Sequence, residues 1–254
     1  MKKKLVKNKD GLLSVNKKPS QQELKNLYKN LYYQKNLSKT YKKRYSHDEI
    51  KFNELNFRLF QLFFKRKHKS ILDIGTGEGY LLSFFIKQNY KCYGVDYSKH
   101  GMISQNPRLL KKIEFVNCDI IEDNFFIGKT FDIIFLMNVA EHVPNFNILI
   151  KKIYKKLKKG GLLIIKVPNE YDIVHKKYLK NNNLKKEQLA IFNPLHHLNY
   201  FNKDSLKKSV LNKVDLKCLT MYSDFPIEMF ILNKFTNYYK NKSFGKNAHD
   251  LRVK

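Results

Sequence analysis

Cysteines, long apolar runs and acidic side chains are all scarce in this chain of 254 residues. The three cysteines, Cys92, Cys118 and Cys218, form no CxxC pair, which argues against a disulfide framework or a zinc site. No apolar run reaches the roughly 18 residues of a transmembrane helix. The basic start resembles the first part of a signal peptide, but charges within residues 7–10 interrupt any apolar core. We therefore expect a cytoplasmic protein with no membrane span and no metal site.

The shortage of acids leaves a large positive charge. Fifty Lys and Arg residues against 22 Asp and Glu residues give a formal net charge of +28. Such a charge suits a nucleic-acid partner. The lysines are spread over nearly every segment beside many asparagines, however, which is typical of a solvated surface and of an AT-rich coding sequence. Nucleic acid is therefore not the expected partner, whereas small anionic substrates suit the charge.

The apolar pattern divides the chain into three regions. Residues 1–19 are basic, contain Gly11 and Pro19, and predict a frayed tail. Residues 20–67 place apolar side chains at three- and four-residue steps, which predicts a helical cap that packs on the next region. Residues 68–254 alternate strands with helices, interrupted by a polar insertion at residues 168–201.

The alternation in the third region predicts an α/β fold with a mostly parallel, Rossmann-like sheet and helices on both faces. A helix with an apolar face from Phe146 to Leu157 is expected to end before Gly160 and Gly161. A helix over Lys203–Leu211 should follow the insertion. The expected strands are Ile71–Ile74, Cys92–Val95, Ile113–Val116, Phe131–Met137, Leu162–Val167 and Val214–Tyr222.

Three glycines mark the junction of the first strand and first helix of this sheet, in ILDIGTGEGY (residues 71–80). Glycine permits positive φ and a close approach to the backbone, and the helix expected from Glu78 would direct free N–H groups toward an anion. The dinucleotide fingerprint GxGxxG requires Gly or Ala at position 80, where Tyr80 stands. The pattern is instead an acid, Asp73, followed by GxGxG.

Later motifs occur in a fixed order after the glycines. YGVDYS ends the second strand at Asp96, VNCDI ends the third at Asp119, and FDIIFLMNVAEHV carries Asn138 at the exit of the fourth. LKKGGLLIIKVPN supplies the turn and the fifth strand. Each acid alone is often only a helix cap. Together, these motifs over residues 71–169 resemble the class I S-adenosylmethionine-dependent methyltransferases, a resemblance that implies a seven-stranded sheet.

The resemblance also implies a cofactor site. Asp96 would accept hydrogen bonds from the ribose hydroxyls, Asp119 would lie beside the adenine with Ile120 on the ring, and Asn138 would lie near the methionine part. Arg44 would meet the cofactor's carboxylate, or else be a solvated surface residue. The residues expected at the cofactor, S-adenosyl-L-methionine, are Asp73, Gly75, Thr76, Gly77, Gly79, Asp96, Tyr97, Asp119, Ile120, Asn138 and Arg44.

The acceptor is suggested by the motifs that follow. No N/D-P-P-Y/F loop and no Pro-Cys pair occur, and AEHVPN is similar to small-molecule methyltransferases. NPLHHLNYFNKDSLKKSV resembles a group often associated with bacterial surface-polysaccharide biosynthesis, although His196 replaces the usual acid. This implies O-methylation, in preference to N-methylation, of a small, anionic sugar, nucleotide-linked or phosphoramidate-type precursor. An RNA methyltransferase, an NAD(P)-dependent oxidoreductase and a non-catalytic basic binding module stay open as alternatives.

A hydroxyl acceptor must lose its proton as the methyl bond forms, and histidine titrates near neutral pH. His142, His196 and His197 occur in segments expected at the carboxyl edge of the sheet. Tyr200 could join them through its hydroxyl, although packing explains it equally well. We predict His197 as the base or substrate anchor, with His142 and His196 as the alternatives; capping or packing is the competing role for each.

Overall fold

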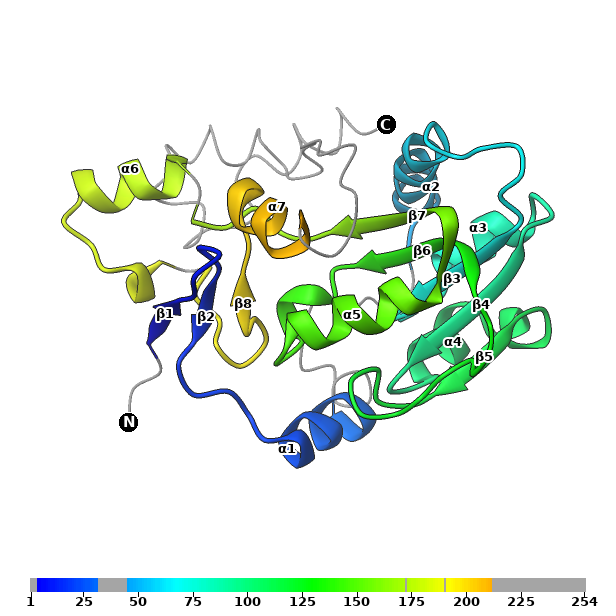
Figure 1. Cartoon of the computed structure of the whole chain (residues 1–254), viewed down its shortest axis with the longest axis horizontal. Helices are drawn as coiled ribbons and strands as arrows, with labels where there is room; N and C mark the ends of the chain where they lie inside the picture. Colours follow the sequence, from blue (N-terminus) through cyan, green and yellow to red (C-terminus); the bar gives the residue numbers. More distant parts are fainter. Residues whose placement is uncertain (1–3, 32–44, 172, 190, 212–254) are drawn as a thin grey trace.

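The computed structural model describes residues 4–31, 45–171, 173–189 and 191–211 (Figure 1). Its centre is a five-stranded, wholly parallel sheet in the order β5-β4-β3-β6-β7. The five strands that the sequence predicts here are confirmed, whereas a seven-stranded sheet is not, and the predicted strand Val214–Tyr222 lies outside the described residues. The strands are β3 (Ser70–Ile74), β4 (Lys91–Asp96), β5 (Glu114–Asn117), β6 (Phe131–Met137) and β7 (Leu157–Lys166).

The strand order creates the crevice in which such sheets bind ligands. β3 pairs with β4 on one side and with β6 on the other, so the chain leaves β3 in one direction and later returns to its opposite edge. A crevice opens at such a point, at the carboxyl ends of the two central strands. The loops after β3 and β6 therefore carry the residues to inspect for function.

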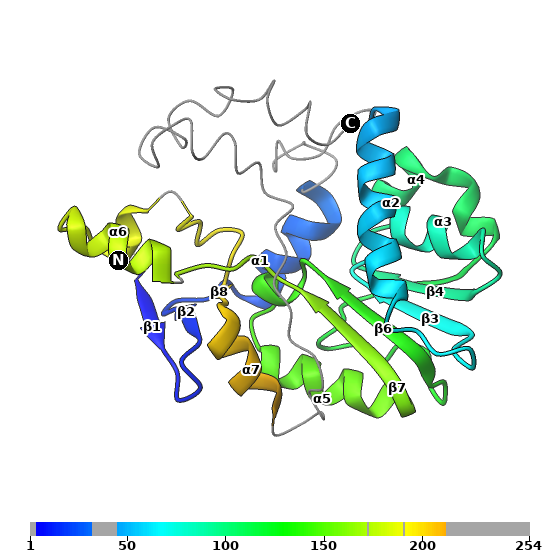
Figure 2. The ribbon, with the colours of Figure 1, turned by 90° about the horizontal axis from the view of Figure 1, so that it is seen from above.

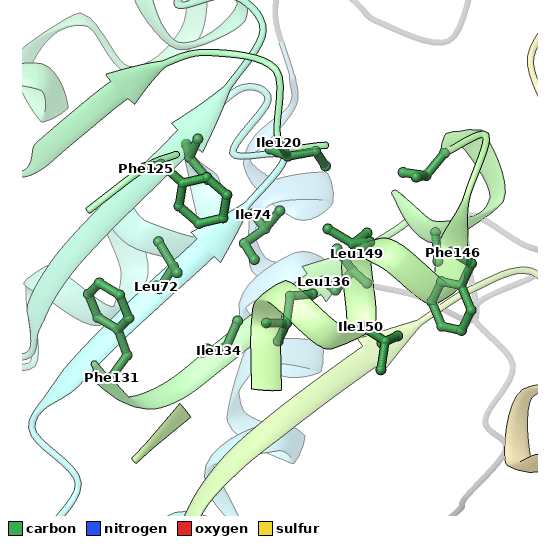
Figure 3. Packing of buried hydrophobic residues seen from close by; sticks show 14 of the residues in the cluster. Leu72, Ile74, Ile120, Phe125, Phe131, Ile134, Leu136, Phe146, Leu149 and Ile150 are labelled. Atoms are coloured by element: carbon green, nitrogen blue, oxygen red, sulfur yellow. The ribbon is translucent and has the colours of Figure 1, made fainter. Parts of the chain in front are cut away.

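Alternate residues of the strands pack on opposite faces of the sheet, as the period of two requires. Ile71 and Ile133 face α2 (His47–Gln61), α3 (Tyr80–Ile86) and α4 (His100–Gln105). Leu72 and Ile134 face α5 (Phe146–Lys156) and α7 (Lys203–Leu211). Figure 2 shows the two sets of helices on the two sides of the sheet, and Figure 3 shows side chains of β3, β6 and α5 packed together. The predicted α/β sheet with two covered faces is confirmed.

The N-terminal segment is folded, which corrects the prediction of a frayed tail. Strands β1 (Leu5–Lys7) and β2 (Leu13–Val15) form an antiparallel hairpin, and Val15 is 2% exposed. Gly11 lies in the turn with φ of +82°, a conformation that glycine adopts without strain. The hairpin is stable because β2 pairs with a distant strand, β8 (Asn199–Tyr200). A helix, α1 (Gln21–Asn26), and a π-helical turn, η1 (Leu27–Leu31), follow.

The predicted insertion at 168–201 builds a second small layer with this hairpin. It contains α6 (Ile173–Asn181), a 3₁₀ turn, η4 (Lys186–Gln188), and β8. Asn199 joins this layer to the main sheet: its side-chain amide donates to the carbonyls of Ala140 and Val143, and its oxygen accepts from Ser14. The loop after β6, which includes the 3₁₀ turn η3 (Ala140–His142), is thus held against the insertion. Among the described helices, none is both long and apolar enough to span a membrane.

Candidate active site

The loop after β3 is held by the acid that ends β4. The carboxylate of Asp96 accepts the N–H of Gly77 at 2.8 Å through Oδ2 and the N–H of Ser98 at 3.1 Å through Oδ1. Thr76 turns its hydroxyl inward, to the carbonyls of Asp73 at 3.1 Å and Val95 at 3.4 Å. The carboxyl ends of β3 and β4 are therefore locked together before any ligand contacts them.

All three glycines of this loop, Gly75, Gly77 and Gly79, have positive φ. At two of them, close packing by other side chains also leaves no room for a Cβ atom. A Cβ on Gly75 would lie 2.3 Å from Cγ2 of Val139, a side chain of the loop after β6. A Cβ on Gly79 would lie 2.7 Å from Cδ2 of Leu109. The sequence suggested that these glycines make room for a ligand. At Gly75 and Gly79 the structure shows that protein side chains already occupy the space next to the backbone.

Asp73 is a buried carboxylate without a full set of partners. It is 3% exposed, and its Oδ1 has no hydrogen-bond partner among the described residues. Burial, together with the nearby charge of Asp96, raises the pKa of Asp73 well above its usual range. Burial also raises the pKa of Asp96, against the opposing hydrogen bonds of its backbone donors. A ligand that donates hydrogen bonds or brings positive charge would relieve both groups.

The ends of β4 and β5 border a cavity of about 340 Å³. Tyr97 donates its hydroxyl to Oδ2 of Asp119, and burial followed by this hydrogen bond raises the pKa of Tyr97. Asp119 also accepts the N–H of Ile121 at 2.7 Å. The cavity wall comes from α1, from Tyr97 and from residues 117–119, 122 and 123. Ile120 points elsewhere: it is 6% exposed and belongs to the core under α5, which places it behind the cavity instead of on its wall.

Two predicted histidines meet at the carboxyl edge of β6, with their rings 5.1 Å apart. His142 places Nδ1 2.6 Å from the carbonyl oxygen of His196, which accepts the Nδ1 proton. Burial lowers the pKa of His142 to about 4, and the carbonyl only partly opposes this effect. His142 is therefore neutral at physiological pH, with its Nε2 lone pair available.

A buried carboxylate that the sequence did not single out holds the other histidine. Nδ1 of His197 lies 2.9 Å from Oε1 of Glu170, which follows β7 and is 5% exposed. Burial alone would lower the pKa of His197, but the hydrogen bond and charge of Glu170, with the charge of Glu141, raise it. The only signal for Glu170 in the sequence is weak: it is an acid placed shortly after a predicted strand.

The other predicted site residues take different positions. Tyr200 is fully buried beside His197, with ring centroids 6.1 Å apart, and its hydroxyl accepts the N–H of Asn193, an arrangement that favours packing over contact with an acceptor. His196 contributes its carbonyl to His142, and burial lowers the pKa of its own ring. Asn138 directly follows β6 and is exposed, with φ of +54°. Arg44 lies outside the described residues.

Tyr28, from η1, links the two groups and was not predicted as a site residue. Its ring stacks on Tyr97 with centroids 5.7 Å apart, and its edge meets His142 at 6.3 Å. The aromatic periodicity of residues 20–67 indicated only packing for this side chain. In the structure, the N-terminal helical segment contributes a ring between the cavity beside Tyr97 and the histidine pair.

Comparison with known proteins identifies the family. A family model described as "Methyltransferase domain" matches residues 45–220. The (S)-coclaurine N-methyltransferase of Thalictrum flavum subsp. glaucum is 26% identical over 48% of this chain and 36% of its own length. The mitochondrial ubiquinone biosynthesis O-methyltransferase of Rattus norvegicus is 26% identical over 72% of this chain and 54% of its own length. The chain thus spans about half or less of these curated relatives.

Solved structures share the fold. The plantazolicin methyltransferase BpumL in complex with SAH superposes with a TM-score of 0.55 at 22% identity, over 86% of this chain and 89% of that one. A second structure of BpumL, with a pentazolic desmethylPZN analog and SAH, gives a TM-score of 0.54 at 23% identity, over 75% and 73% of the two chains. The Rossmann-like methyltransferase fold is therefore confirmed.

Proposed function

Because this chain belongs to the family of methyltransferase domains, we propose that it transfers the methyl group of S-adenosylmethionine to a hydroxyl of a small, anionic acceptor. Membership of the family confirms the predicted enzyme class, an S-adenosylmethionine-dependent methyltransferase, and with it the cofactor. The acceptor, the methylated atom and the roles of individual residues are the proposal. The observation that supports the proposal is the position of His142 and His197 next to the loops that follow β3 and β4.

The residues at the ends of β3, β4 and β5 fit the cofactor. When bound, S-adenosylmethionine supplies an electrophilic methyl group on its sulfonium. Asp96 accepts the backbone N–H groups of Gly77, Ser98 and Tyr97, and its two oxygens, with about four acceptor sites, retain the capacity to accept a ribose hydroxyl. Oδ1 of Asp73, for which the described part of the chain offers no hydrogen-bond partner, suits a donor on the methionine part. Tyr97 and Asp119 border a cavity beside these groups, where we place the adenine.

The histidine pair serves the acceptor in this proposal. A hydroxyl in line with the methyl group must release its proton as the new bond forms. His142 and His197 each place Nδ1 against an oxygen atom, which leaves the second ring nitrogen, Nε2, as the one available to an acceptor. Glu170 fixes the orientation of His197, as a carboxylate does for the histidine of a catalytic triad. Tyr28 keeps these rings next to the cofactor cavity.

An anionic sugar, nucleotide-linked or phosphoramidate-type precursor of a bacterial surface glycan is the proposed acceptor. The resemblance of residues 193–210 to that group of enzymes supports it, and the net charge of +28 favours an anion. The named relatives include both an O- and an N-methyltransferase. The free imidazole nitrogens favour an acceptor that must lose a proton, as a hydroxyl does. We place the enzyme in the cytoplasm, where its free cysteines Cys92 and Cys118 would stay reduced.

The test is methyl transfer from labelled S-adenosylmethionine to a panel of sugar nucleotides, phosphosugars and amines. We expect a product methylated at oxygen. His197→Ala should lower turnover by about 10²–10⁴, the range for lost acid–base assistance, and leave cofactor affinity unchanged. The control is His47→Ala, which removes an exposed histidine at the start of α2. Methylation at nitrogen alone, or unchanged turnover per folded molecule in His197→Ala, would contradict the proposal; the second result would move the proton acceptor to His142.

A further inference from the structure

We infer that Glu141, His142 and His197 bind one divalent first-row transition-metal ion at the acceptor side of the site. One donor atom from each of the three residues lies within 4.8 Å of the donor atoms of the other two. Oε1 of Glu141 is 3.8 Å from Nε2 of His142. Two ligand atoms that each bind one ion at about 2.0–2.2 Å are at most about 4.4 Å apart, so a separation of 3.8 Å allows a shared ion, and one near 4.8 Å requires a small side-chain shift when the ion binds.

The hydrogen bonds around the two imidazoles are those that metal-bound histidines make. A histidine ligand usually donates its other ring N–H to a carboxylate or a backbone carbonyl, which fixes the tautomer and the ring orientation. His142 places Nδ1 against the carbonyl of His196, and His197 places Nδ1 against the carboxylate of Glu170. Both partner types therefore occur here, and both rings keep Nε2 for a ligand.

An independent observation points to a missing cation. Glu141 is 1% exposed, and its Oε2 has no hydrogen-bond partner among the described residues. A buried carboxylate oxygen without a partner is costly and rare in folded proteins. Its other oxygen faces His142, whose Nδ1 proton is already donated elsewhere. A metal ion between Glu141 and the two imidazoles would satisfy Oε2, for which the described residues provide no donor.

The ligand set selects the class of ion. Two imidazole nitrogens and one carboxylate oxygen suit Zn²⁺, Mn²⁺, Fe²⁺ or Co²⁺, whereas Mg²⁺ and Ca²⁺ prefer sites made of oxygen alone. Three protein ligands leave positions open for a small molecule, as in catalytic metal sites. The sequence predicted no metal site because its cysteines form no CxxC pair, and the cysteines are not among the ligands of this proposed site. The pairing of residues 141 and 142 with residue 197 depends on the fold of the insertion.

The role of the ion rests on the proposed function. An ion at this position would bind the acceptor's hydroxyl and lower its pKa, and the released proton would pass to a water molecule. The histidines would then serve as ligands, which replaces the general-base role proposed for them above. Metal binding can be measured without cofactor or acceptor. A failure of the metal site is therefore distinguishable from a failure of the proposed methyl transfer.

The experiment titrates ZnCl₂ and CoCl₂ into the full chain, prepared without a histidine tag and stripped with a chelator. Calorimetry should show one tight site per chain, and Co²⁺ should give visible absorption bands of a nitrogen- and oxygen-ligated ion. Glu141→Gln and His197→Gln should each weaken binding at least about tenfold. Glu170→Gln, which removes only the support of His197, should weaken it about 10–100-fold. His47→Ala should have no effect.

Two results would overturn the inference. One is the lack of a saturable site in the unaltered protein, and the other is binding of equal strength in Glu141→Gln and His197→Gln. Circular dichroism must show both variants folded; since the His197 side chain is 23% exposed, its replacement offers a second readout if Glu141→Gln fails to fold. Methyl transfer that is abolished by the chelator and restored by Zn²⁺ or Co²⁺ would support the role of the ion, and transfer indifferent to the chelator would exclude that role.

Discussion

Asp96 combines a structural task with a proposed binding task in one carboxylate. Its two oxygens hold the loop of Gly77 and the turn at Ser98, and their remaining lone pairs face the proposed ribose position. A neutral side chain could satisfy one of these N–H groups but could not offer charged acceptors to two hydroxyls as well. Binding of the cofactor should therefore depend on this residue more than the stability of the fold does.

Asp96→Ala should weaken S-adenosylmethionine binding by about 1.5–3 kcal/mol, the usual value for hydrogen bonds to a charged group, or about ten- to 150-fold in Kd. Isothermal titration calorimetry measures the effect, with Asp204→Ala in the first turn of α7 as the control. NAD should not bind the unaltered protein, since Tyr80 stands where the dinucleotide fingerprint requires a glycine. An unchanged Kd in Asp96→Ala would remove this residue from the site.

Gly75→Ala tests whether packing explains the first glycine of the loop. Gly75 and Gly128 have φ of +77° and +73°, so an alanine meets similar backbone strain at both positions. Only at Gly75 would the new Cβ clash, with Val139; around Gly128 nothing lies within 4 Å. Gly128→Ala should therefore cost about 1 kcal/mol of unfolding free energy, and Gly75→Ala about 1–3 kcal/mol more, the usual cost of overpacking.

Urea denaturation provides the measurement, and a double variant provides the control. Val139→Ala removes the clashing methyl groups, so adding it to Gly75→Ala should recover part of the lost stability. The coupling between the two changes should be well outside the roughly 0.3–0.5 kcal/mol within which independent sites add. Equal losses of unfolding free energy in Gly75→Ala and Gly128→Ala would show that the contact with Val139 adds nothing to the backbone strain. Packing would then not explain the glycine at position 75, and room for a ligand would be the remaining explanation.

Single residues could be predicted where their position follows from the local pattern. Asp96 ends β4 and Asp119 follows the end of β5 by two residues, so the sequence alone places them at one edge of a parallel sheet. Glu170 and Tyr28 lie in segments with no such register, and only the folded chain brings them to His197 and Tyr97. The contact of Val139 with Gly75 was likewise out of reach, since two loops 64 positions apart in the sequence make it.

At the scale of elements, Asp132 ties three strands of the sheet together. From β6 it accepts hydrogen bonds from the backbone N–H and hydroxyl of Ser70, at the start of β3, and an ion pair from Lys158 in β7. Burial disfavours its charge, but the donors of Ser70, Lys69 and Lys158 outweigh burial and lower the pKa of Asp132. The charged form is therefore the one that the folded state stabilises.

Asp132→Asn should lower the free energy of unfolding at pH 7 by about 1.5–3 kcal/mol, the range for hydrogen bonds to a charged group. Because the folded pKa is depressed, this stabilisation is present above the unfolded pKa of about 3.9 and is lost as the pH falls toward the folded pKa. The difference between the two proteins should therefore shrink between pH 7 and pH 3. Denaturant titrations at both pH values test this, with Asp48→Asn, an exposed acid of α2, as the control.

The elements differ in how much of their stability is local. The five strands of the sheet were predictable because each is an apolar run with turn residues around it, and α7 begins at the residue that its pattern indicates. The hairpin of β1 and β2 was predicted as a tail, because short basic strands acquire a buried face only by pairing with β8 nearly 200 residues away. Other non-local contacts bring His197 to His142: Leu198 donates its N–H to the carbonyl of Glu141, and Asn199 donates its amide to those of Ala140 and Val143.

At the scale of the whole molecule, 50 basic residues outnumber 22 acids. Four of the acids, Asp73, Asp132, Glu141 and Glu170, are buried, and the acids that reach the surface are too few to balance the lysines there. A surface with this balance attracts any polyanion through counterion release, without a sequence-specific contact. Such attraction weakens steeply as the salt concentration rises and is the same for every sequence, whereas specific recognition depends on the sequence that is bound.

Binding to RNA should therefore be weak and general. We expect Kd values of about 10⁻⁴–10⁻⁶ M at physiological salt, equal for unrelated sequences, and a fall in log K that is linear in log salt concentration. Fluorescence anisotropy with a hairpin, a single strand and a duplex, each between 50 and 200 mM salt, would measure this. A dextran sulfate competitor should displace all three equally, because only charge is recognised. Tight binding to one structured RNA that persists at 200 mM salt, with methyl transfer onto that RNA, would replace the small anionic acceptor by a nucleic-acid substrate.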